Sequence, residues 1–274
     1  MKINKIKAIY FSGTGTTAKA VSSFAQTMAE LLDVPCDIIC INPPAVRKVE
    51  IAFSETDLAI IGCPTYAGRL PNLLLPYFQT KLKGNNTLAV PICLYGNRSV
   101  DDALMELRNT LQENGFCTIG AAAVVGQHVF APRLGIQRPT AGDGKMLKTL
   151  ADRVYEKIDE LEAPPELPVD VVGNDPVGPY YVPQDRYGYP INIVKVRPRT
   201  DKTKCNKCGI CIRTCPMGAI SPDPNQVPGP CIKCGFCFKI CPTKAKYYDD
   251  EGMLYHKKEL EAQYFEPKQT QIFY

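Results

Sequence analysis

The sequence KIKAIYFSGTGTTAKA, residues 5–20, decides the fold of the first half of the chain. Its apolar run, Ile6–Phe11, is typical of a strand that is buried on both faces of a parallel sheet. The run passes into a loop of glycines and hydroxyl side chains, Ser12–Thr17, and then into the helix-period segment Thr17–Leu32. A strand, a glycine-rich turn and a helix in this order predict the first unit of an α/β fold.

The same alternation continues to residue 162. Further strands are predicted at Cys36–Ile41, Leu58–Cys63, Leu88–Leu94 and Thr118–Val125. Further helices are predicted at Leu73–Leu82, Val100–Glu113 and Lys145–Leu161, the last behind a capping signature at Thr140–Asp143. Five strands with interleaved helices predict a doubly wound α/β domain with a five-stranded parallel sheet, whose ligands bind at the carboxyl ends of the strands.

Composition excludes several classes of protein. The 274 residues are 45% hydrophobic and 22% charged, which is globular and not disordered, collagen-like or coiled-coil. No apolar run approaches the roughly 20 residues of a membrane-spanning helix. The N-terminus breaks into glycine and threonine too early for a signal peptide, which predicts a cytoplasmic protein. Its 13 cysteines then indicate metal sites more than disulfides.

Positive charge is concentrated in one short segment. Residues 1–190 hold 18 Lys and Arg against 20 Asp and Glu, whereas residues 191–246 hold 11 against 2 and residues 247–274 hold 3 against 6. The basic segment contains Lys195, Arg197, Arg199, Lys202 and Lys204 and leads into eight cysteines. A solvated surface is the simplest interpretation. No accompanying motif supports nucleic-acid binding, and we favour a surface that steers an acidic redox partner.

The eight cysteines form an internal repeat. Residues 205–220, CNKCGICIRTCPMGAI, and residues 231–246, CIKCGFCFKICPTKAK, are identical at eight of sixteen positions. Each copy reads C-x₂-C-x₂-C-x₃-C-P. The alternative, a pair of structural zinc sites, would use paired Cys-x₂-Cys units and not four cysteines in eleven residues.

The repeat resembles the bacterial-type 2[4Fe–4S] ferredoxins over most of residues 200–246. In two-cluster ferredoxins the fourth cysteine of each motif ligates the other cluster. The resemblance therefore implies one cluster on Cys205, Cys208, Cys211 and Cys241, and a second on Cys231, Cys234, Cys237 and Cys215. The glycines Gly209 and Gly235 allow close backbone approach to the sulfurs.

The loop after the first strand predicts a phosphate site. Gly13-x-Gly15-x-x-Ala18 satisfies the loose dinucleotide fingerprint, which is weak evidence alone, and no Walker lysine follows. Its hydroxyl density favours a terminal phosphate held by side-chain OH groups and by amides at a helix N-terminus. Two further strand-end loops, Gly62–Pro71 and Tyr95–Arg98, are expected at the same edge of the sheet.

These three loops resemble those of the flavodoxin family, which binds FMN. The resemblance implies that the phosphate is bound by Ser12, Gly13, Thr14, Gly15, Thr16 and Thr17. It also implies that the flavin ring is framed by Pro64, Thr65, Tyr66, Ala67, Gly68, Tyr95, Gly96, Asn97 and Arg98. Tyr95 is the first candidate to stack on the ring, and Tyr66 is the second. A domain that keeps these loops only as turns is the alternative.

Together the two halves resemble the flavodoxin–ferredoxin fusion proteins of anaerobic bacteria and archaea, called ferrodoxins. This implies a flavodoxin-like domain at residues 1–162, a Pro- and Tyr-rich linker at 163–199, an α+β ferredoxin domain at 200–246 and a tail at 247–274. The linker could instead be a strap packed against one domain. The expected function is electron transfer between two [4Fe–4S] clusters and FMN, in exchange with a redox protein such as an acidic ferredoxin.

A ferredoxin-dependent reductase with a small-molecule substrate is the second hypothesis, and a redox sensor is the third. No second dinucleotide motif supports direct NAD(P)H oxidation. No residue stands out as a catalytic acid beyond the loop tyrosines and His128, which is more simply a surface residue. The remaining cysteines, Cys36, Cys40, Cys63, Cys93 and Cys117, are expected to pack in the core. Oligomeric state and the physiological partner stay open.

Overall fold

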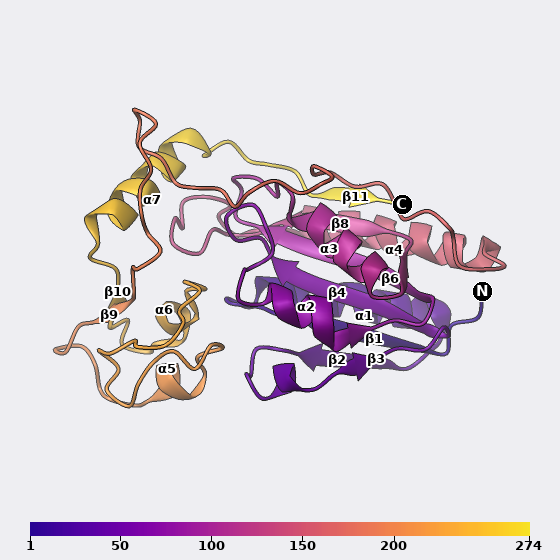
Figure 1. Ribbon diagram of the computed structural model, residues 1–274, viewed down its shortest axis with the longest axis horizontal. Helices are drawn as coiled ribbons and strands as arrows, with labels where there is room; N and C mark the ends of the chain where they lie inside the picture. The colour runs from indigo at the N-terminus through magenta and orange to yellow at the C-terminus, as the bar shows by residue number, and fades with distance from the viewer.

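A parallel sheet forms the centre of the first domain. The computed structural model describes residues 1–274. Five parallel strands lie in the order β2-β1-β4-β6-β8 (Figure 1), with bounds β1 Lys5–Tyr10, β2 Cys36–Cys40, β4 Asp57–Pro64, β6 Thr87–Tyr95 and β8 Ala121–Val125. Counting these five strands alone, the order is 2-1-3-4-5, that of the flavodoxin-like doubly wound fold. The fold class predicted from the sequence is confirmed.

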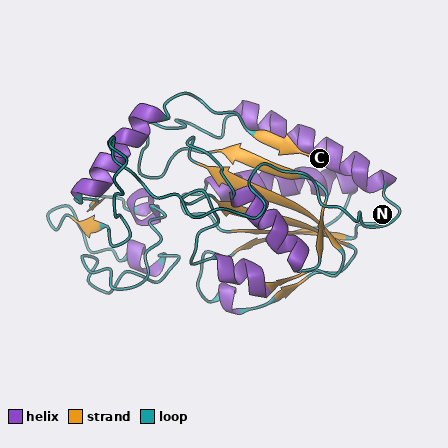
Figure 2. Ribbon diagram, turned by 45° about the horizontal axis from the view of Figure 1, so that its top comes forward, coloured by secondary structure: helices purple, strands orange, loops and turns teal.

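Helices cover both faces of this sheet. Helices α1 (Thr16–Leu32) and α4 (Ala141–Glu160) pack on one face, and α2 (Leu75–Lys81) and α3 (Ala103–Glu113) pack on the other (Figures 1 and 2). Every residue of β6, and all of β4 except its last, is buried, because a central parallel strand is covered on two sides. Two apolar clusters, one under each helix layer, form the core.

Short elements complete this domain. The 3₁₀ turn η1 (Val46–Lys48) follows β2 along the chain, the two-residue strands β3 (Ile51–Ala52) and β5 (Leu82–Lys83) pair with each other in parallel, and β7 (Phe116–Thr118) pairs with β6. The predicted cap of α4 is present: the Thr140 side chain accepts from the backbone, and the Thr140 N–H donates to the Asp143 carboxylate over 2.6 Å. Each predicted strand and helix of residues 1–162 is found within a few residues of its expected bounds.

Residues 163–181 form a strap packed along this domain. The Val169 N–H donates to the Thr118 carbonyl over 3.0 Å, and Val169 and Val171 are each 7% exposed within the core. Further along, the Gly178 N–H donates to Asp102 Oδ2 over 2.7 Å, and the Tyr180 hydroxyl donates to the Leu70 carbonyl over 2.9 Å. Of the two alternatives for the Pro- and Tyr-rich segment, the structure has the strap over residues 163–181, and the rest of the segment continues toward α7 and the cysteine module.

The cysteine repeat forms a small module at one end of the molecule (Figure 1). It contains α5 (Ile210–Arg213) and α6 (Phe236–Ile240), and its ends are joined by the antiparallel strands β9 (Arg199–Thr200) and β10 (Lys246–Tyr247). The two copies share their backbone shape, since Gly209 and Gly235 have φ of 69° and 67° in front of α5 and α6. These left-handed values are the reason for glycine at both positions.

The C-terminal segment returns to the first domain. Helix α7 (Glu251–Gln263) begins at Asp250, whose side chain accepts from the Met253 N–H, and crosses from the module toward the sheet. Strand β11 (Gln271–Phe273) then pairs antiparallel with β8 and forms the edge of the sheet (Figure 1). Neither element was predicted from the sequence. None of the helices has the length and apolar character needed to cross a membrane.

Candidate iron–sulfur and flavin sites

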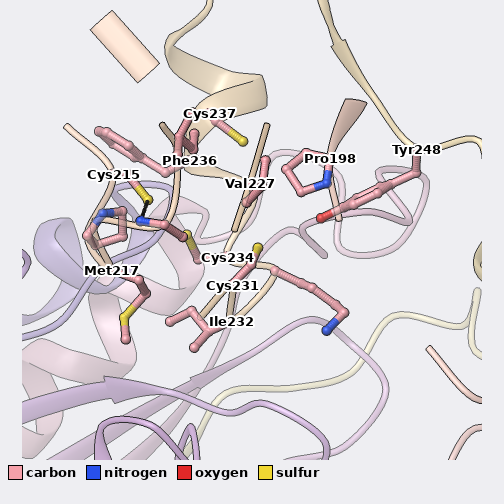
Figure 3. Close-up of a pocket in the computed structure, with 15 residues that line it drawn as sticks. Pro198, Cys215, Met217, Val227, Cys231, Ile232, Cys234, Phe236, Cys237 and Tyr248 are labelled. Carbon is pink, nitrogen blue, oxygen red and sulfur yellow. Dashed lines mark hydrogen bonds between the residues drawn. The ribbon is translucent and has the colours of Figure 1, made fainter. Parts of the chain in front are cut away.

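Four of the eight module cysteines line one apolar cavity. Cys215, from the first copy of the repeat, faces the same space as Cys231, Cys234 and Cys237 from the second copy (Figure 3). The walls include Ile232, Phe236, Val227 and Tyr248. This is the set of four that crossed ligation implies for the second cluster. The thiols do not converge on one point in this structure, so the assignment of ligands stays a prediction.

Burial keeps two thiols of this cavity, those of Cys234 and Cys237, protonated when no iron is bound. It raises the pKa of Cys234 to about 12 and the pKa of Cys237 to about 12. Iron binds the thiolate, so each ligand must release a proton when a cluster is built. The apolar wall that raises the pKa also excludes water from a cluster in this cavity, and hydrophobic surroundings are one control on reduction potential.

The two Cys-Pro cysteines have equivalent hydrogen bonds. The Ala219 N–H donates to Cys215 Sγ over 3.4 Å, and the Ala245 N–H donates to Cys241 Sγ over 3.3 Å. Burial alone would raise the pKa of Cys241, but hydrogen bonds from Thr243 and from backbone amides bring it below its ordinary value. Amide donors at sulfur stabilise the thiolate that a cluster needs.

The other predicted set lies nearer the solvent. Cys208 is exposed, whereas Cys205, Cys211 and Cys241 are partly buried. Burial raises the pKa of Cys211, and the charges of the other three cysteines add to that rise, because all four lie close together. The structure thus places one cysteine set in an enclosed cavity and the other near the surface of the module.

The predicted phosphate loop has the geometry of an anion site. Helix α1 begins at Thr16 behind Gly15, whose φ is 91°, and no side chain caps this terminus. The N–H groups of Thr16, Thr17 and Ala18 find no acceptor in the protein. The loop itself is fixed: Gly15 donates to Ser12 Oγ over 3.0 Å. Free amides at the positive end of a helix dipole fit a phosphate group.

The second loop provides an unpartnered hydroxyl and an aromatic ring. Thr65 Oγ1 is buried without a hydrogen-bond partner, although the Thr65 N–H donates to the Leu94 carbonyl over 2.6 Å. An unpaired buried hydroxyl is costly unless a ligand satisfies it. The phenol of Tyr66 lies beside Gly13 of the phosphate loop, and burial raises its pKa well above the ordinary value. The residues at these two loops therefore fit FMN.

The third loop, Tyr95–Arg98, makes contacts that differ from the predicted ones. Tyr95 is 7% exposed in the core, and its hydroxyl donates to the Gln269 carbonyl over 3.1 Å. The Asn97 amide donates to the Tyr264 and Glu266 carbonyls and so holds the C-terminal tail. The Tyr95 ring could stack on a flavin only by leaving the core. Tyr66, the second candidate, is the aromatic side chain that reaches the phosphate loop.

Arg98, the last residue of this loop, pairs with Asp101, and its guanidinium lies 4.2 Å from the centre of the Tyr181 ring in the strap. Gly96 packs against His128, where a Cβ would come within 2.6 Å of the imidazole. The residues of the loop thus contact the strap, the C-terminal tail and His128. A flavin in this site would meet the third loop mainly through its backbone.

The cysteine module packs against the loops that are predicted to bind flavin. A Cβ on Gly13 would lie 2.8 Å from the Cys234 carbonyl oxygen and 2.9 Å from the Cys234 Cβ. Arg47 Nη2 donates to the Pro216 carbonyl over 2.5 Å, and the Lys239 ammonium donates to the Thr14 carbonyl. The enclosed cysteine set is therefore the one beside the predicted phosphate loop. Sequence reasoning missed both residues, since Arg47 belongs to no motif and Lys239 is at a variable position of the cysteine motif.

His128 and His256 meet where α7 crosses the loop at residues 129–142. Phe130 contacts both rings, with centroids at 4.5 Å from His128 and 5.9 Å from His256. The Ala131 N–H donates to His128 Nδ1, which requires a neutral imidazole there. Burial and nearby positive charge lower the pKa of each histidine to about 4. His128 is partly buried and is not the surface residue that the sequence suggested, and His256 is 4% exposed.

The other cysteines belong to the first domain. Cys63 and Cys93 are fully buried in its core, and burial raises the pKa of both thiols. Cys36, Cys40 and Cys117 are partly buried at its strands.

Comparisons with protein families and with solved structures both give matches. The family model of the 4Fe-4S dicluster domain matches residues 204–245. A flavodoxin from the domain Archaea is 14% identical, covers 57% of this chain and 99% of its own length, and has a TM-score of 0.39. The Streptococcus pneumonia TIGR4 flavodoxin is 17% identical over 56% and 99%, with a TM-score of 0.40.

Two-electron reduced Megasphaera elsdenii flavodoxin is 15% identical over 55% and 98%, with a TM-score of 0.39. Comparison with curated proteins gives no match. At such low similarity the fold assignment rests on the strand order of the sheet. The chain joins a flavodoxin-like domain to a ferredoxin-type 4Fe–4S domain, a combination that indicates electron transfer.

Proposed function

We propose that this protein passes electrons between two [4Fe–4S] clusters and FMN and thereby converts one-electron into two-electron steps. Clusters exchange single electrons at low potential, and FMN accepts one or two. The observation that carries the proposal is the contact between Gly13 and Cys234, because it makes the predicted phosphate loop and a predicted cluster ligand neighbours. The chain's own residues fix this separation; the cofactors supply the redox chemistry.

The exposed cysteine set supports entry of electrons at the far side of the module. Cys208 lies beside two exposed cations: Lys207 is its neighbour in the sequence, and Arg213 donates to the Cys208 carbonyl over 3.1 Å. A positive surface beside a cluster would steer an acidic partner, which we propose to be a ferredoxin-like redox protein. Reduction by such a partner should slow steeply as salt is raised. A rate independent of ionic strength would contradict the proposed steering.

Cofactor analysis of protein purified without oxygen tests the main proposal. We expect about eight irons, about eight acid-labile sulfides and one FMN per chain, since each cubane holds four irons. Reductive titration should then bleach the cluster and flavin bands. Full iron content without bound flavin, under conditions where added FMN also fails to bind, would refute the conduit. A location in the cytoplasm stays a prediction.

A reductase with a small-molecule substrate is the second candidate, and a cavity favours it. A space of about 690 Å³ opens beside the second and third loops, lined by Gly68, Arg98, Asp101, Asp102 and the strap residue Tyr181. Such a volume suits a small organic ligand. Repeated oxidation of the reduced flavin by a small molecule, with an Arg98→Ala variant that loses it, would favour this candidate over the carrier.

A further inference from the structure

One lysine of the iron–sulfur module reaches the phosphate loop of the other domain. Lys239 lies in α6, between the predicted ligands Cys237 and Cys241. Its ammonium crosses the interface and donates to the carbonyl of Thr14, more than two hundred residues earlier in the chain. An ammonium group has three N–H donors, so two remain free at this position.

The phosphate loop has no positive side chain of its own. Ser12–Thr17 contains only glycine, serine and threonine, and Lys19 is exposed on α1. Arg47, the other cation at this edge, is engaged by the carbonyls of Ile41, Asn42 and Pro216. Lys239 is therefore the cation that the fold brings to the loop. A phosphate group at the free amides of α1 would gain a charge-assisted hydrogen bond from it.

We propose that Lys239 is a binding residue for the phosphate group of the flavin nucleotide, supplied to the flavodoxin-like domain by the iron–sulfur module. This inference rests on the proposed function, which requires FMN at the loop. Its consequence is that retention of FMN depends on docking of the module. The flavin site is then complete only in the assembled two-domain chain, and the short loop needs no lysine of its own.

A different role for Lys239 would be to tie the two domains together through Thr14, with no contact to the nucleotide. The two roles differ in their dependence on phosphate. FMN and riboflavin carry the same ring and ribityl chain, but only FMN has the phosphate. A phosphate ligand affects FMN alone, whereas a purely structural tie supports the binding of both flavins equally.

Equilibrium binding of the two flavins to anaerobic, cluster-loaded protein tests the inference. Free flavin is separated by ultrafiltration and measured by its fluorescence, so that quenching by the clusters does not interfere. The variants are Lys239→Gln and Lys239→Arg, with Lys244→Gln as the control, because Lys244 is an exposed lysine of the same module. The iron content of each variant is measured first, because Lys239 lies between two predicted ligands.

We expect Lys239→Gln to weaken FMN binding about fivefold to tenfold, a modest effect because the side chain is exposed. Riboflavin binding should change less than twofold. Lys239→Arg should keep most of the affinity for FMN, since it keeps the charge, and Lys244→Gln should behave as the unsubstituted protein. The loss in Lys239→Gln should shrink at high salt.

Equal weakening of FMN and riboflavin would overturn the inference in favour of the structural tie. Unchanged FMN affinity in Lys239→Gln with full iron content would overturn it as well. Both results leave the proposed function standing. Failure of the unsubstituted protein to bind FMN would instead refute the proposed function, and this inference with it.

Discussion

Replacing Gly13 by alanine tests the close approach of the two domains. A Cβ at this position would lie 2.8 Å from both the Cys234 carbonyl oxygen and the Tyr66 hydroxyl. The backbone of Gly13 is outside the left-handed region, so alanine itself is conformationally acceptable. The change therefore acts through added volume between the phosphate loop and the cysteine module, and not through backbone strain.

The expected cost follows from those distances. An ordinary contact to a Cβ begins near 3.4 Å, so the loop and the module must separate by about 0.6 Å, the difference from 2.8 Å. The opposing atoms belong to backbone and a Cβ as well as to the tyrosine, so they cannot simply rotate away. Overpacking of this kind costs about 1–3 kcal/mol. We expect Gly13→Ala to lower the free energy of unfolding by that amount and to weaken FMN binding.

Gly144→Ala is the matched control. Gly144 lies in the first turns of α4, and a Cβ there would meet no atom within 4 Å. Alanine is the better helix former by up to about 1 kcal/mol, so this variant should be slightly stabilised. Anaerobic urea titrations followed by far-ultraviolet circular dichroism and by cluster absorbance measure both changes. If Gly13→Ala unfolds at the same urea concentration as the unsubstituted protein, or at a higher one, the tight interface does not exist.

Three further predictions use the buried polar groups. Glu106→Gln should lower the free energy of unfolding by about 3 kcal/mol, because it leaves the partly buried Arg69 without its bidentate carboxylate. Glu113→Gln, at an exposed position of the same helix, should leave the stability unchanged. Thermal unfolding of both variants measures the difference. His128 and His256 are neutral in the fold with a pKa of about 4, below the unfolded value, so stability present above pH 6.5 should fall as the pH drops toward 4. Linkage puts the loss at roughly 1–2 kcal/mol per histidine between pH 7 and 5, and a flat urea midpoint over that range would contradict it. Cys215→Ser should lose about half of the iron and keep the cluster of the surface set, as iron analysis and electron paramagnetic resonance can show.

The elements that the sequence predicted well are those whose signal is local. Each buried strand is a continuous apolar run, and the cap of α4 follows from Thr140 and Asp143 alone. The strap and β11 have no such signal. Val169 and Val171 are two apolar residues in a proline-rich stretch, and they are core residues only because α3 and β7 leave room for them. Such packing depends on partners far away in the sequence.

The candidate sites divide in the same way. Cys215 and Ser12 could be proposed because their motifs resemble those of ferredoxins and flavodoxins, and both assignments stay predictions. Tyr95 was expected to face a flavin, yet the returning tail supplies a carbonyl for its hydroxyl and covers it. Lys239 and Arg47 could not be found, since a contact between two domains depends on which faces meet. The faces that meet are determined by the shapes of both surfaces and not by a local sequence pattern.

Because β11 pairs with β8, the C-terminal segment belongs to the central sheet of the first domain. The chain starts in the central sheet at β1, leaves through the strap, builds the cysteine module and α7, and ends again in the same sheet (Figure 1). The module is thus an insertion with two covalent tethers, which keep its effective concentration at the flavin loops high even if the interface opens. A single proteolytic cut in the exposed turn at Tyr187–Tyr189 should leave both fragments associated, with cofactors and spectrum intact. The pairing of Gln271–Phe273 with β8 would hold the C-terminal fragment on the central sheet.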